Sequence, residues 1–250
     1  MVDNRYATAL VIGSVLSLLA TVYLSVAVGT QNWFQYNNTV QHPVQQCINT
    51  TVIKNEFLTG EFDEKTYSSH LFTWNGTLGL WWRCIQVPHC THWYCCQQDP
   101  KTETLCVSFT LPQQFSTKVK QNTSEEDLLR TYLWRCQFLL PLVSLSLVFL
   151  SGLVGVCACL CRSFTPTLVV GLFHFIAGLC SLGTVCCFLS SVHLLNSEYK
   201  KPKNVGELVG WSLYLALISF PLQMMAAALF LWAARSHRKH YTRITAYRVA

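Results

Sequence analysis

Residues 7–28 read ATALVIGSVLSLLATVYLSVAV, a stretch without a single charged side chain. At about 1.5 Å of rise per helical residue, it is long enough to cross the roughly 30 Å hydrocarbon core of a bilayer. Three later stretches, 136–160, 168–192 and 208–234, are also uncharged and somewhat longer. All four exceed the length expected of a buried helix in a soluble protein. The sequence therefore predicts four transmembrane helices with these bounds.

The composition of the 250-residue chain agrees with a membrane protein. Hydrophobic residues make up 51% of it and charged residues only 12%. Soluble chains carry about 25% charged residues, so the composition argues against a water-soluble globular enzyme. The net charge of +6 would fit weak nucleic-acid binding if it were spread over a soluble surface. Because it is confined to a few segments beside the spans, we expect no nucleic-acid partner.

The basic residues are concentrated on one side of the predicted spans. Four spans place both termini on the same side as the turn between the second and third spans. These three segments hold one acid, Asp3, and seven basic residues: Arg5, Arg162, Arg235, Arg238, Lys239, Arg243 and Arg248. In the two loops on the other side, acids and bases balance. Because short segments rich in Lys and Arg stay in the cytoplasm, we predict cytoplasmic termini.

This topology divides the chain into nine segments. In order they are a cytoplasmic N-terminus (1–6), the first span (7–28), a long extracellular loop (29–135), the second span (136–160), a cytoplasmic turn (161–167), the third span (168–192), a short extracellular loop (193–207), the fourth span (208–234) and a cytoplasmic tail (235–250). A cleavable signal peptide ending near Ala27-Val28-Gly29 is the alternative for the first span. Its apolar run, however, is longer than the roughly 7–15 residues of a signal peptide.

The long loop carries all four N-glycosylation sequons, at Asn37, Asn49, Asn75 and Asn122. Glycans are added on the lumenal side of the membrane, so their clustering agrees with an extracellular loop. A segment of about a hundred residues is also too long for a simple connector. We therefore expect the loop to be a small folded domain that carries N-linked glycans at these four positions.

Alternating apolar residues and turn signals indicate a small β domain in this loop. Strands are predicted at 32–36, 71–74, 78–85 and 105–109. The dipeptide Asn75-Gly76 is a strong hairpin signal between the second and third of them. Ser124, followed by three acids, is typical of a helix N-terminus, and that helix would continue into the second span.

Thirteen cysteines divide between the long loop and the spans. The six loop cysteines, which allow fifteen pairings, are Cys47, Cys84, Cys90, Cys95, Cys96 and Cys106. Cys84 and Cys106 lie on predicted strands, and a bridge between them would stabilise the loop by about 3 kcal/mol. The spacing of His92 and Cys95 also allows a metal site, but extracellular thiols favour disulfides. We expect disulfides here, and neither a metal nor a cofactor.

Two cytoplasmic motifs each have a functional interpretation and a simpler alternative. Cys157, Cys159 and Cys161 end the second span, where thiols can be palmitoylated or can serve as small packing residues. Tyr241 and Ile244 match the pattern of a tyrosine-based sorting signal, which is also common by chance. The basic tail that contains them is expected to bind anionic membrane lipid.

The spans hold none of the charged residues that proton relays and ion-coupled transport require. His174 and Ser181 lie seven residues apart in the third span, without an acid to complete a catalytic triad. We expect His174 to face the bundle and to bond a hydroxyl or carbonyl group. The sequence therefore predicts no catalytic residues and no enzymatic activity.

Trp33, the triplet Gly79-Leu80-Trp81, Cys84 and Cys106 occur in this order between the first two of the four spans. The combination resembles the W…GLW…C…C signature of the claudin and peripheral-myelin-protein superfamily. The resemblance implies an all-α, left-handed four-helix membrane bundle with a small antiparallel β-sheet as its extracellular domain. It also implies a Cys84–Cys106 disulfide, with Trp33 and Gly79-Leu80-Trp81 seating the sheet on the bundle.

The resemblance further implies a non-enzymatic plasma-membrane protein of cell–cell junctions that controls adhesion and paracellular permeability. Its expected partners are membrane lipid and other membrane proteins, laterally or across cells. Aromatic residues near Trp82 and Trp93 would make such contacts if exposed; the alternative is that they fill the core of the sheet. Glycans on Asn37 and Asn49 would hinder lateral packing, and the ending Arg248-Val249-Ala250 makes binding to PDZ scaffolds unexpected. The alternative function is an auxiliary or trafficking subunit of a channel or receptor, a role that other members of the superfamily fill.

Overall fold

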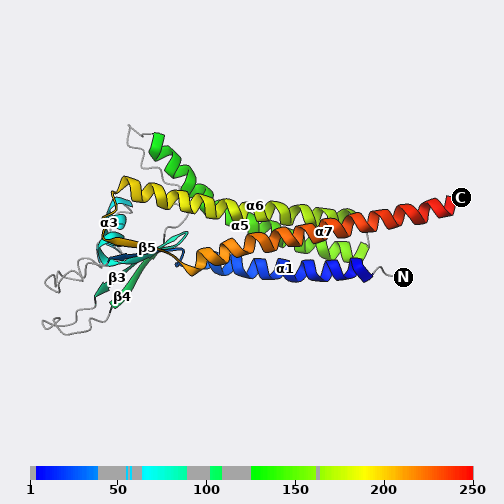
Figure 1. Ribbon diagram of the computed structural model, residues 1–250, viewed down its shortest axis with the longest axis horizontal. Helices are drawn as coiled ribbons and strands as arrows, with labels where there is room; N and C mark the ends of the chain where they lie inside the picture. The colour runs from blue at the N-terminus through cyan, green and yellow to red at the C-terminus, as the bar shows by residue number, and fades with distance from the viewer. Residues whose placement is uncertain are drawn as a thin grey trace. The chain divides into compact units, whose positions relative to one another are not determined.

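The computed structural model describes residues 4–38, 55, 57, 64–88, 102–108, 125–161 and 164–249. Its elements are α1 (Asn4–Gly29), β1 (Phe34–Asn38), α3 (Glu64–Trp74), β2 (Gly76–Leu78), β3 (Trp82–Pro88), β4 (Thr102–Ser108), α5 (Glu125–Cys161), α6 (Phe164–Glu198), β5 (Val205–Val209) and α7 (Trp211–Val249) (Figure 1). The predicted class, four long helices with a small antiparallel sheet, is confirmed.

Four helices are long and apolar enough to cross a membrane. The corresponding segments are Tyr6–Gly29, Leu129–Cys157, Thr165–Glu198 and Trp211–Ser236. The helices continue past the uncharged stretches. Helix α7 runs 15 residues further, to Val249, and α5 begins 11 residues earlier, at Glu125, as the acids after Ser124 predict. Pro141 and Pro221 lie inside α5 and α7 without ending them. Membrane helices accept such prolines when neighbouring groups satisfy the freed carbonyls.

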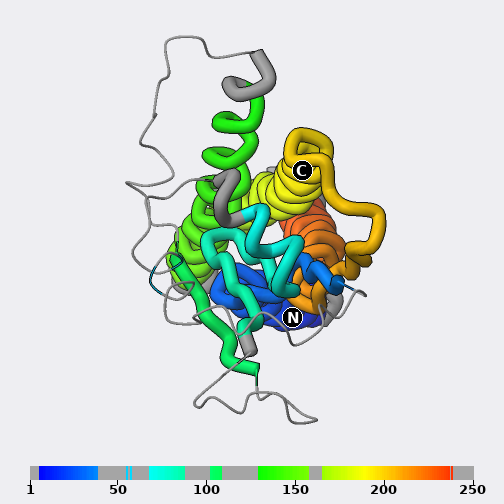
Figure 2. The backbone as a smooth tube through the Cα atoms, turned by 90° about the vertical axis from the view of Figure 1, so that its left-hand side faces the viewer, coloured from blue at the N-terminus to red at the C-terminus, as the bar shows by residue number. Residues whose placement is uncertain are grey.

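The helices form one compact unit, made of residues 1–28, 136–186 and 215–250. Seen end-on, its four helices lie side by side as a bundle (Figure 2). Glycines let α6 and α7 approach closely, because a Cβ atom at Gly171 would lie 2.8 Å from Leu231 and one at Gly178 would lie 3.1 Å from Met224. Close approach through small residues is the usual basis of helix association in membranes.

Hydrogen bonds between helices cluster around His174 in the bundle. Its Nδ1 lies 2.9 Å from the Val170 carbonyl and 3.0 Å from Ser151 Oγ, and its Nε2 lies 2.6 Å from Ser17 Oγ. Because a carbonyl only accepts, the Nδ1–H donates and Nε2 accepts from the Ser17 hydroxyl. The ring also packs at 5.2 Å on Phe230, so His174 contacts all three other helices. The predicted bonding of His174 is thus confirmed.

A second compact unit, residues 29–135 and 187–214, holds the sheet. The strand order is β4-β3-β2-β1-β5, and every neighbouring pair is antiparallel. The pairing puts one set of side chains on an apolar face and the alternate set on a polar face. The apolar face carries Phe34, Tyr36, Leu78, Ile85, Val87, Leu105 and Val107, and all of them are buried. Helix α3 packs on this face through Phe72, whose ring lies 5.2 Å from Tyr36.

Three features of this unit differ from the sequence predictions. The single strand predicted at 78–85 is interrupted, because residues 79–81 form a turn between β2 and β3. Residues 71–74 are the end of helix α3 and not a strand, so the hairpin predicted at Asn75-Gly76 is wrong. Asn75, at φ 60°, ends that helix in the left-handed conformation, a position that Asn tolerates. The short loop predicted at 193–207 contains the end of α6 and most of β5, and α7 begins only at Trp211. Pairing of β5 with β1 makes this loop part of the sheet.

Candidate functional site: the sheet and its signature residues

Trp33 joins the end of α1 to the sheet and is fully buried. Its amide donates to the Leu78 carbonyl at 3.1 Å, and its own carbonyl accepts from the Gly210 amide at 2.9 Å. Its ring lies 5.0 Å from that of Phe188 on α6. Trp33 therefore connects three segments that are far apart in the sequence: the start of β1, the end of β2 and the junction of β5 with α7.

The triplet Gly79-Leu80-Trp81 forms the tight turn between β2 and β3. The Gly79 amide donates to the Trp82 carbonyl at 2.8 Å, and Leu80 is buried. A Cβ atom at Gly79 would lie 3.0 Å from the Cα atom of Gln31. Glycine at this position thus lets the turn approach the segment that follows α1.

Arg83 holds the same turn from the apolar face of the sheet. It is only 4% exposed, and its Nη1 donates to the carbonyls of Gly79 at 3.0 Å and Trp82 at 3.1 Å. Its guanidinium also lies 5.6 Å from the centre of the Trp134 ring on α5, within cation–π range. No pattern in the sequence indicates this role, because arginine side chains are mostly exposed.

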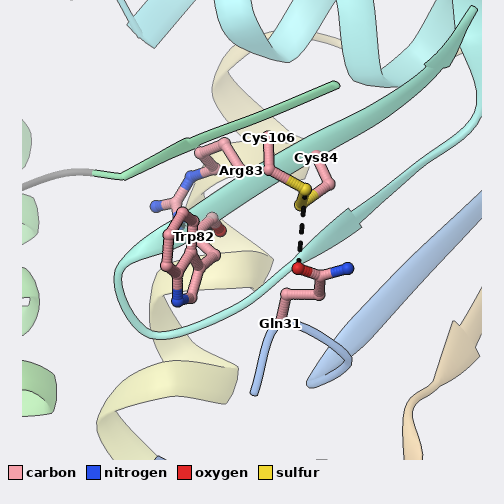
Figure 3. Close-up of a disulfide and its surroundings, with 5 residues drawn as sticks. All are labelled: Gln31, Trp82, Arg83, Cys84 and Cys106. Carbon is pink, nitrogen blue, oxygen red and sulfur yellow. Dashed lines mark hydrogen bonds between the residues drawn. A yellow bond between two sulfur atoms is a disulfide. The ribbon is translucent and has the colours of Figure 1, made fainter. Parts of the chain in front are cut away.

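Cys84 and Cys106 form a disulfide between β3 and β4, with their Cα atoms 4.1 Å apart (Figure 3). The two residues are direct partners in the antiparallel register, so the bridge fixes this pairing. Gln31 Oε1 lies 3.5 Å from Cys106 Sγ. This is a van der Waals contact, because a disulfide sulfur carries no hydrogen to donate. The disulfide that the resemblance implied is present.

Polar contacts also connect α5 and α6 to the sheet region. Arg130 forms an ion pair with Glu198, donates to the Tyr199 hydroxyl at 2.9 Å, and lies 5.9 Å from the centre of the Trp134 ring. Trp134 is therefore flanked by the guanidinium groups of Arg83 and Arg130. Arg130 is 68 positions from Glu198 and 69 from Tyr199, and Arg83 is 51 positions from Trp134, so sequence reasoning could not find these pairings.

A second network joins β1, α6 and β5. The Tyr36 hydroxyl donates to Asn196 Oδ1 at 2.8 Å, and Asn196 Nδ2 donates to Glu207 Oε1 at 2.8 Å. Glu207 also forms an ion pair with Lys201. The network positions the edge strand β5 against the end of α6.

A comparison with known protein families assigns the chain independently of this geometry. The family model described as PMP-22/EMP/MP20/Claudin tight junction matches residues 18–232, most of the chain. The chain belongs to this family. It is accordingly a four-pass membrane protein without enzymatic activity. In this claudin-family member the signature residues lie before β1, in the turn between β2 and β3, and on β3 and β4.

The predicted glycosylation sites have different surroundings in this family member. Asn37 is a partly exposed residue of β1 on the polar face, where its Oδ1 accepts from Gln35 Nε2 at 3.2 Å. Asn75 is also partly exposed, and its Oδ1 accepts from the Asn38 amide. Asn49 and Asn122 lie outside the described residues. Glycan attachment at all four stays a prediction.

The other predicted sites are placed only in part. Cys157 is an exposed residue near the end of α5, and Cys159 and Cys161 continue that helix. Tyr241 and Ile244 lie within α7. Palmitoylation and sorting stay predictions. The remaining loop cysteines, Cys47, Cys90, Cys95 and Cys96, lie outside the described residues. His92 and Trp93 also lie outside them.

Proposed function

We propose that the protein acts at cell–cell junctions of the plasma membrane, where contacts of its sheet limit paracellular leakage. The main support for the proposal is a sheet that is fixed by a disulfide and by buried contacts. It occurs in a member of a family whose description names the tight junction. This sheet is held in one conformation by the disulfide, by the hydrogen bonds of Arg83 to the turn carbonyls and by the buried Trp33. A preformed surface loses little conformational entropy when it binds a neighbouring molecule.

The proposal includes the orientation of the chain in the membrane. The basic residues around both termini and the turn between α5 and α6 support a cytoplasmic location of those segments. The sheet unit, with its disulfide and its predicted glycosylation sites, then faces the extracellular space. Proteolysis of sealed cells would test this orientation, because an extracellular protease should cleave only the loops.

The polar face of the sheet supports a barrier that does not select by charge. Gln35, Gln86 and Thr104 lie on this face, on three different strands, and each is at least partly exposed. The charged residues of the described strands, Arg83, Glu103 and Glu207, belong to the other set of side chains. Contacts made through the polar face would therefore present amide and hydroxyl groups to solutes. We expect the flux of small cations and anions to change together.

Epithelial or endothelial monolayers that lack the protein test its barrier function. We expect lower electrical resistance and higher tracer flux, both restored by the wild-type chain. A Cys84→Ser/Cys106→Ser chain that reaches the surface at the same level should restore less, because β3 and β4 lose their covalent bridge. Unchanged resistance and flux in the knockout would refute the junctional role.

A second candidate function, as an auxiliary or trafficking subunit of a channel or receptor, is favoured by the position of Asn37. A glycan there would cover part of the polar face and would hinder contacts between sheets. Cross-linking and mass spectrometry on native membranes separates the two functions. Recovery of this chain with junction proteins supports the first, and stoichiometric recovery of a channel or receptor supports the second.

We also propose that the chain belongs to the claudin domain-containing branch of the family. This placement rests on a resemblance in three segments: Asp3-Asn4-Arg5, the stretch DLLRTYLWRCQFLLP at 127–141 and the ending AYRVA at 246–250. A phylogenetic tree that groups the chain with ordinary claudins instead would overturn it.

A further inference from the structure

The exposure and polarity of the side chains change along the five residues of the edge strand β5. At its start Val205 is buried, and Gly206 and Glu207 follow as small and charged residues. At its end Leu208 and Val209 are 54% and 41% exposed. Successive residues of a strand point to opposite faces, so apolar side chains are exposed on both sides of the sheet at this end. An edge strand in water normally carries charged or polar residues instead.

The exposed end of β5 leads directly into a helix that crosses the membrane (Figure 1). Helix α7 starts at Trp211, and Trp211 and Tyr214 in its first turn are about half exposed. The exposed apolar stripe continues along α7 with Leu217 and Ile218, as expected of a surface that faces lipid. Trp and Tyr at the end of a span prefer the interface between lipid and water.

Distances along the strand place its end at the depth of this interface. At about 3.3 Å per residue, Val209 lies at most roughly 7 Å and Leu208 at most roughly 10 Å from Trp211. The polar layer on each side of a bilayer is about 5–8 Å thick. In the described sheet β5 pairs only with β1, so backbone groups along its other edge have no strand partner. Water and lipid headgroups can satisfy such groups, whereas hydrocarbon cannot.

We propose that the end of β5 and the first turn of α7 insert into the membrane interface and anchor the edge of the sheet to phospholipid. Leu208 and Val209 contact the upper acyl chains, and Trp211 and Tyr214 lie at headgroup level. The Lys201–Glu207 ion pair marks the water side of the strand. The anchor does not depend on the proposed junctional role, because it follows from the exposure and order of these residues alone.

Site-specific photo-cross-linking tests the anchor. A benzophenone amino acid replaces Leu208 in the full chain, reconstituted in phosphatidylcholine vesicles, and the matched control replaces Gly206 on the same face of the same strand. We expect several-fold more phospholipid adducts at position 208 than at 206. A second pair, Val209 against Glu207, repeats the comparison on the opposite face if one variant fails to fold. Intact Cys84–Cys106 linkage identifies folded protein.

Equal lipid adducts at 206 and 208, and at 207 and 209, would overturn the anchor. So would cross-linking at 208 and 209 that goes mainly to a second copy of the chain, because the strand edge would then be a protein interface. The same substitutions in native membranes extend the test to other proteins. A dominant adduct with a different membrane protein at these positions would likewise exclude lipid as the partner.

Discussion

Gly210, between β5 and α7, has the least room for a side chain among the described glycines. A Cβ atom there would lie 1.9 Å from the Asn32 carbonyl oxygen. The Gly210 amide also donates to the Trp33 carbonyl, so the backbone cannot shift without breaking this bond. We expect Gly210→Ala to destabilise the sheet unit by about 1–3 kcal/mol or more, as overpacking does. Thermal unfolding of the detergent-solubilised protein would measure the loss.

Gly29→Ala is the matched control for this substitution. A Cβ atom at Gly29 meets no other atom within 4 Å, and alanine is the better helix former at the end of α1. Its unfolding temperature should equal or exceed that of the wild type. Similar losses in both variants would show that general sensitivity to alanine, and not the close approach to Asn32, decides the outcome.

Asn75 combines a backbone role with a predicted glycosylation site, and two substitutions separate them. Asn75→Gln removes the sequon, the residue suited to φ 60° and the bond to the Asn38 amide. Thr77→Val removes only the sequon, because the buried Thr77 hydroxyl has no hydrogen-bond partner among the described residues. If the site is occupied, both variants should lose the mass of one glycan on a gel.

Only Asn75→Gln should also lower stability, by about 1–3 kcal/mol, the usual cost of a strained backbone position. Thr77→Val should be neutral or slightly stabilising, because it removes an unpaired buried polar group. Thermal unfolding after enzymatic removal of all glycans measures this difference directly. Equal stability of the two variants would assign no structural role to the Asn75 side chain.

At the scale of elements, Arg83 stabilises the turn between β2 and β3. Arg83→Lys keeps the positive charge but loses the planar group that reaches two carbonyls and packs on Trp134. Each hydrogen bond from a charged group is worth about 1.5–3 kcal/mol, so we expect a loss of at least that size. Urea unfolding in detergent would measure it. Gln86→Ala, an exposed change on the same strand, should cost almost nothing.

His174 is the corresponding link between the transmembrane helices. His174→Phe keeps a ring that can pack on Phe230 but loses the bonds to Ser17 and Ser151. Interhelical hydrogen bonds in membranes contribute about 0.6 kcal/mol on average and up to about 1.7. A double-mutant cycle with Ser151→Ala should therefore give a coupling energy in this range. Coupling indistinguishable from zero would mean that the hydrogen bond between His174 and Ser151 does not contribute to helix association.

The elements that sequence could predict are those fixed by local physical constraints. The spans follow from the need to satisfy every backbone group in hydrocarbon, which an uncharged helix does by itself. Helix α3 escaped prediction because its local pattern resembles a strand and its packing on Tyr36 comes from another part of the chain. Strand β5 was not predicted for a similar reason, because in the described sheet it forms only by pairing with β1.

The signature residues were predictable only through family resemblance, and their geometry was not. Nothing in the spacing of Trp33 and Gly210 indicates that their backbones share a hydrogen bond. The burial of Arg83 could not be predicted from the sequence either, because a charged residue is almost never expected in a core. Such contacts depend on pairing across long sequence separations, which composition and periodicity do not encode.

At the scale of the whole molecule, the chain consists of a helix unit and a sheet unit that share α5, α6 and α7. The bridge between Cys84 and Cys106 lies entirely within the sheet unit. Closing a loop of this size contributes about 3 kcal/mol to stability, which corresponds to roughly a hundredfold in the equilibrium constant for local opening.

Cys84→Ser/Cys106→Ser should thus speed backbone hydrogen exchange in β3 and β4 by up to this factor. Exchange in α6 between Val170 and Val185 should stay as slow as in the wild type. Mass spectrometry of the protein in nanodiscs resolves the two regions, and equal acceleration in both would mean that the units open as one.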